Sequence, residues 1–117
     1  MPMPPVPAVK LTPVAYFPEK YFLENLAVRA DGSILITAAL HKELWCVPRP
    51  EPDPQVSPVL VHTFDLPIAG IVEVEPDVFI VSLSDGYTSH ESHLARVDFT
   101  GWTPGNPVSR ADHRHVR

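Results

Sequence analysis

The sequence predicts an all-β fold of two consecutive four-stranded antiparallel blades, the second incomplete, of the kind found in β-propellers. One observation is a pattern of strand, tight turn, strand, loop and strand that occurs twice, over residues 24–48 and 69–99. The hairpins of the two copies align without a gap when residues 34–37 are placed on residues 78–81, an offset of 44 residues. A four-stranded propeller blade occupies roughly 40–45 residues.

The first copy contains four predicted strands. Glu24 to Ala30 and Ser33 to Leu40 flank Asp31-Gly32, a strong hairpin signal because glycine tolerates the positive φ of two-residue turns. The second of these strands is apolar on both faces, as expected for a strand covered on both sides. Leu44 to Val47 and Val59 to Phe64 complete the first blade.

The second copy has three predicted strands: Ile71 to Val74, Val78 to Leu83 and Leu94 to Phe99. A fourth strand is expected near Val108. Residues 110–117 are instead basic and show no alternation of apolar and polar positions. The second blade is therefore predicted to lack its outer strand, and open strand edges favour self-association.

Fifteen prolines mark the boundaries, because proline has no N–H for a β-ladder. They predict a disordered N-terminus over residues 1–11, with 12–17 as a weak edge strand. A partial propeller over 12–105 follows, with blade one at about 24–64 and blade two at about 69–99. Residues 106–117 are predicted to be an irregular basic tail.

Composition excludes several classes of function. The formal net charge is −5 and no basic stripe exists, so neither nucleic acid nor a membrane is an expected partner. No apolar run approaches the ~18 residues of a membrane span, and no signal peptide is visible, which makes the cytoplasm the default location. Cys46 is the single cysteine and lies in an apolar run, so it is interpreted as a buried structural thiol.

Several segments carry a family resemblance, namely residues 23–29, 31–37, 43–45 and 70–79. They resemble the N-terminal two blades of six-bladed propellers of the SMP-30/gluconolactonase/LRE-like superfamily, in particular a fungal group associated with secondary metabolism. The resemblance implies a small-molecule substrate. It also implies either a lactone hydrolase that uses a divalent cation such as calcium, or a cyclase whose channel is a shaped pocket.

In the lactonase branch a first-blade glutamate binds the metal, and Glu24 stands at the matching position. Its partners in later blades have no counterpart here, so the alternative is a solvated strand-end carboxylate. Asn25 is a candidate for the same channel mouth, or a residue that hydrogen-bonds its own backbone. No catalytic residue is identified and no cofactor is expected for this chain alone, since calcium needs six to eight oxygen ligands.

Two functions remain open from the sequence. The chain is expected to be an inactive fragment of such a lactonase-like or cyclase-like propeller. The alternative is a non-catalytic binding module that closes a propeller by self-association. Histidines such as His90 and His93 do not match the spacing of a zinc motif and are interpreted as solvated loop residues.

Overall fold

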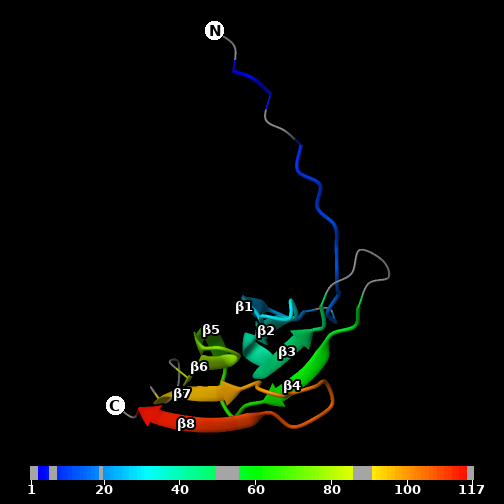
Figure 1. The fold of residues 1–117 in the computed structure, drawn as a ribbon. Helices are drawn as coiled ribbons and strands as arrows, with labels where there is room; N and C mark the ends of the chain where they lie inside the picture. The colour runs from blue at the N-terminus through cyan, green and yellow to red at the C-terminus, as the bar shows by residue number, and fades with distance from the viewer. Residues whose placement is uncertain (1–2, 6–7, 19, 50–55, 86–90, 116–117) are drawn as a thin grey trace.

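A computed structural model describes residues 3–5, 8–18, 20–49, 56–85 and 91–115. Two antiparallel sheets of four strands follow one another along the chain, in the spatial orders β1-β2-β3-β4 and β5-β6-β7-β8 (Figure 1). The first sheet, called blade one, comprises β1 (Leu23–Val28), β2 (Ile34–Ala38), β3 (Glu43–Val47) and β4 (Val59–Thr63). Blade two comprises β5 (Ile68–Glu75), β6 (Val78–Asp85), β7 (Glu91–Asp98) and β8 (Ser109–His115). The prediction of an all-β chain with two blades is confirmed.

Strand β8 corrects the prediction of an incomplete second blade and of an irregular tail over residues 106–117. Its backbone pairs with β7 along its whole length, from Ser109 opposite Asp98 to His115 opposite Ser92. A blade's outermost strand has one neighbour and a solvated edge, so it needs no apolar alternation. The search for such a pattern therefore missed it. Arg110 of β8 lies over the ring of Phe64, with its guanidinium carbon 4.7 Å from the ring centroid.

The N-terminal segment differs in part from expectation. The described residues before β1 form no strand, and Thr12 to Phe17 is not an edge strand, since its proline interrupts the run of N–H donors. Phe17 instead sets its ring edge-on against Trp45, 5.6 Å between centroids. Trp45 thus packs beneath the N-terminal segment rather than between the blades. Residues 1–2 and 6–7 of the predicted disordered stretch lie outside the described residues.

The hydrophobic core lies between the two blades. Leu35 on β2 and Phe79 on β6 are both fully buried in it. The other buried members come from both blades and the turn that follows β7: Leu44, Cys46, Phe64, Ile68, Val81, Leu83, Ala95, Val97, Phe99 and Trp102. The blades are therefore held together chiefly by apolar burial, and each supplies one face of the shared core.

The same hydrogen bond occurs at equivalent places in both blades. In blade one, the backbone N–H of Asn25 donates to Thr37 Oγ1 over 3.0 Å. In blade two, the backbone N–H of Gly70 donates to Ser82 Oγ over 2.8 Å. Residue 25 therefore corresponds to residue 70, and residue 37 to residue 82, an offset of 45 residues.

This offset corrects the sequence alignment by one residue, which matters because successive side chains of a strand point to opposite faces. Leu35 and Thr37 face blade two, whereas Phe79 and Val81 face blade one. Ile80 lies between Phe79 and Val81 and points away from blade one. At an offset of 44, Leu35 would match Phe79 on the wrong face; at 45 it matches Ile80.

Candidate functional site

The innermost strands β1 and β5 lie beside each other, and a groove opens where both strands begin. This channel-mouth groove has a volume of about 630 Å³. Its lining residues come from both blades and from the turns beside them: Phe22, Glu24, Ala39, Leu40, Pro67, Ile68, Ala69 and Ser84. The size lies within the range of small-molecule pockets, roughly 300–1,000 Å³.

The lining of the channel-mouth groove is mostly apolar. Leu40 and Phe22 are large and exposed, at 72% and 55% of their surface. Among the described residues that line the groove, Glu24 is the only one with an ionisable side chain, and Ser84 adds a hydroxyl group. This arrangement suits a molecule with an apolar body and one polar end. The side chain of Glu24, a residue singled out from the sequence, is exposed and lines this groove.

The surroundings of Glu24 do not fit a calcium site. Among the described residues, no group of three or more histidine, cysteine, aspartate or glutamate side chains could hold a metal ion. A single carboxylate supplies two of the six to eight oxygen atoms that calcium takes. The predicted role of Glu24 as a metal ligand thus has no support from a donor set within the described part of this chain.

Asn25 makes local backbone contacts. Its Oδ1 accepts a hydrogen bond from the backbone N–H of Leu26 over 2.8 Å. The residue also lines a smaller groove of about 270 Å³ together with Glu24 and Ile36. The side-chain oxygen is thus used within the strand, which matches the backbone-bonding alternative.

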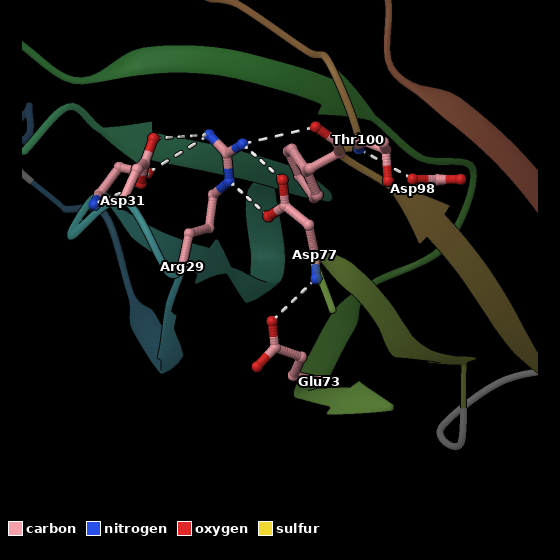
Figure 2. A network of polar contacts seen from close by, with 8 residues as sticks. Arg29, Asp31, Glu73, Asp77, Asp98 and Thr100 are labelled. Carbon is pink, nitrogen blue, oxygen red and sulfur yellow. Dashed lines mark hydrogen bonds and ion pairs between the residues drawn. The ribbon is translucent and has the colours of Figure 1, made fainter. Parts of the chain in front are cut away.

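A buried ion pair joins the blades at the opposite end of β1. Arg29 is 8% exposed. Its Nε donates to Asp77 Oδ1 and its Nη2 donates to Asp77 Oδ2, each over 2.9 Å (Figure 2). The guanidinium carbon lies 5.2 Å from the ring centroid of Phe99 and 5.5 Å from that of Trp102. The hydrogen bonds to Asp77 raise the pKa of Arg29 further above its already high value. Nothing in the sequence pattern pairs Arg29 with a partner 48 residues away.

Two turns support this ion pair. Asp77 has a φ of +63°, in the left-handed region, and its backbone N–H donates to Glu73 Oε2 over 3.0 Å. Asp31 accepts hydrogen bonds from the Ser33 hydroxyl and backbone N–H, at 2.6 and 2.8 Å. The Ser33 hydroxyl bond, with a smaller contribution from Arg29, lowers the pKa of Asp31. Carboxylates therefore stand on both sides of Arg29 (Figure 2).

The remaining candidates from the sequence have structural settings. Cys46 is 1% exposed, and burial raises the pKa of its thiol, so the interpretation as a buried structural cysteine is confirmed. His93 is 8% exposed on β7, with its Nε2 3.0 Å from Glu91 Oε1, so the interpretation of His93 as a solvated loop residue is wrong. His90 lies outside the described residues.

No protein-family model, curated protein or solved structure matches this chain. In the described part of the chain, no helix has the length and apolar character needed to cross a membrane.

Proposed function

We propose that this chain supplies two blades of a propeller whose channel-mouth groove binds a small, mostly apolar molecule. The observation that carries the proposal is the groove itself, which lies between the starts of two inner strands and has apolar walls and one carboxylate. Small-molecule sites combine apolar walls with a few placed polar groups in this way. Glu24 accepts a hydrogen bond from the polar end of the ligand, and Leu40 and Phe22 cover its apolar body.

Of the two activities implied by the family resemblance, the lining favours a cyclase-like reaction over a metal-dependent lactonase. A cyclisation needs mainly a shape that holds the reacting carbons close and aligned. Two blades form only part of a channel wall, so we expect these two blades on their own to bind a ligand without turnover.

Ligand binding is testable with 1,2-octanediol, which combines an apolar chain with hydroxyl groups that can donate a hydrogen bond to Glu24. The ¹⁵N-labelled chain is titrated and its amide resonances are followed. Saturable shifts at Leu40, Ala69 and Ser84 are expected, and they should be lost in Leu40→Arg. Leu11→Arg is the matched control, because Leu11 is 87% exposed and lies outside the groove.

Two results would contradict the proposal. One is the absence of saturable shifts at the groove. The other is an equal response in Leu40→Arg, which would place binding elsewhere. A parallel titration with calcium chloride tests the metal alternative: saturable calcium-dependent shifts around Glu24 would favour the lactonase branch over the cyclase branch.

A further inference from the structure

Blade two has a second face, turned away from blade one, that repeats the face through which blade one binds blade two. We call this the open face of blade two, and three of its residues follow from the 45-residue offset and the strand register. Val72 corresponds to Ala27, Ile80 to Leu35 and Ser82 to Thr37. Leu94, opposite Ser82, corresponds to Leu44, which is opposite Thr37. Leu44 is fully buried by blade two, whereas Leu94 is 42% exposed and Val72 is 57% exposed.

The polar contact at the centre of this face is also repeated, but with only one of the two hydrogen bonds. In blade one, Thr37 Oγ1 accepts from Asn25 and donates to the backbone carbonyl of Ala69 in blade two, over 3.0 Å. Ser82 Oγ accepts from Gly70 in the same way. Within the described part of the chain, the Ser82 hydroxyl donates to no acceptor, so the bond that crosses to the next blade lacks its second partner.

We propose that a second copy of this chain docks its blade one on the open face of blade two. By the 45-residue offset, the residue that corresponds to Ala69 is Glu24. Ser82 Oγ of one copy therefore donates to the backbone carbonyl of Glu24 in the next copy. The contact repeats between molecules the blade-to-blade contact already present within each molecule.

Blade one offers a complementary apolar surface. Leu26 and Val28 are 57% and 56% exposed on β1, and they share with half-buried Ile36 the face turned away from blade two. Phe17 and Tyr21 cover Trp45 on the outer part of that face. The inner part, formed by β1 and β2, is left for the docking copy.

Charge at the rim supports the same pairing. Gly32 occupies the position in blade one that Asp77 has in blade two. The exposed side chain of Arg49 lies beside it, with Cγ 3.3 Å from where a Gly32 side chain would begin. Glu75 on blade two is 61% exposed and follows Val74, which occupies the Arg29 position. Between copies, a carboxylate on blade two thus meets a guanidinium on blade one, the reverse of the Arg29–Asp77 polarity.

Two different faces meet in this contact, so the association is head-to-tail and closes when the rotation completes a ring. Three copies would hold six blades, the number in the propellers that the sequence resembles. The inference deepens the proposed function and rests on it, because a closed ring completes the channel around the channel-mouth groove.

The test is the molar mass of the whole chain by sedimentation equilibrium. We expect three times the monomer mass of 13.0 kDa. Val72→Arg and Leu26→Arg each disable one face at an exposed position, so each variant alone should be monomeric. Mixed together, the two variants should form a one-to-one pair, because each retains the face that the other lacks. Leu11→Arg is the surface control and should assemble as the unaltered chain does.

Ser82→Ala tests the central hydrogen bond and should raise the dissociation constant about fivefold, whereas Ser82→Thr restores the residue of blade one and should not. A monomeric unaltered chain, or variants that assemble alone, would overturn the inference. Failure of the mixed variants to pair would also overturn it. A monomer that still binds 1,2-octanediol refutes the docking only, while an assembled chain that does not bind the diol refutes the proposed function.

Discussion

Arg29 and Asp77 form a two-pronged hydrogen bond between blade one and blade two, with both N–O distances at 2.9 Å. The planar guanidinium matches the two carboxylate oxygens, which gives this contact direction as well as attraction. The rings of Phe99 and Trp102 cover the cation and keep water away from it. The ion pair therefore fixes how the blades are oriented, while the apolar core between them supplies most of the attraction.

Replacing Asp77 by asparagine should destabilise the fold by about 2 kcal/mol, because the buried Arg29 cation loses its counter-charge. Asparagine tolerates the left-handed conformation of Asp77, so backbone strain does not contribute to the loss. Urea unfolding followed by tryptophan fluorescence measures the change. Glu75→Gln is the control, and both variants are measured in the Leu26→Arg background, which is expected to be monomeric. Glu75→Gln breaks an exposed ion pair with Arg96 and should cost less than about 0.5 kcal/mol. Equal losses of unfolding free energy in the two variants would show that the Arg29–Asp77 pair stabilises the fold no more than an exposed ion pair does.

Asp31 should make the protein more sensitive to acid. Its folded-state pKa lies below the ordinary value of 3.8, chiefly because of the Ser33 hydroxyl. The stability that Asp31 contributes is thus present above pH 3.8 and is lost as the pH falls through the folded-state pKa. The difference in urea midpoint between the unaltered chain and Asp31→Asn should be small, since the side chain is 59% exposed, and should vanish at low pH. A difference that grows on acidification would reverse this assignment.

Cys46 should resist thiol reagents in the folded protein. Its side chain is 1% exposed, and burial raises the pKa of the thiol, so both access and thiolate are lacking. Reaction with an aromatic disulfide reagent should proceed only as fast as the protein opens, and at once in concentrated urea. Rapid modification under native conditions would show that the core between the blades opens readily.

The 45-residue offset predicts that alanine substitutions at Leu35 and at its counterpart Ile80 lower the free energy of unfolding by different amounts. Leu35→Ala removes a fully buried side chain and should cost about 3 kcal/mol. Ile80→Ala removes its counterpart on the open face and should cost about 1 kcal/mol when measured in the Leu26→Arg background, which is expected to be monomeric. Urea midpoints give both values. Similar costs would contradict the placement of Ile80 on the open face of blade two.

The blades could be predicted from the sequence because each hairpin carries its own signal. Asp31-Gly32 and the apolar runs around it specify a local pairing that needs no distant partner. The outer strand β8 carries no such signal, since its pairing depends on the backbone of β7 rather than on side-chain alternation. The Arg29–Asp77 pair could not be predicted from the sequence for a related reason. Its two residues are 48 positions apart, and only the docking of the blades brings them together.

The family resemblance predicts Glu24 at a channel mouth, and in the structure Glu24 lines a groove between the starts of β1 and β5. The other residues that line this groove could not be predicted from the sequence. Leu40 follows β2 in the short 3₁₀ helix Ala39–His41, and Pro67 precedes β5, so their meeting depends on how two separately formed sheets dock. The correspondence of faces between the two blades could not be predicted either, because an alignment of similar apolar runs does not detect a slip of one residue.

Both sheets are simple meanders in which every strand pairs only with its neighbours along the chain. Such local pairings close small loops, so each sheet has a low entropic barrier to formation. Contacts such as Leu35 with the second sheet, and Arg29 with Asp77, require two formed sheets to meet. The order of events during folding should therefore be two meanders first and their mutual docking second. A substitution at Asp77 would then speed unfolding more than it slows folding.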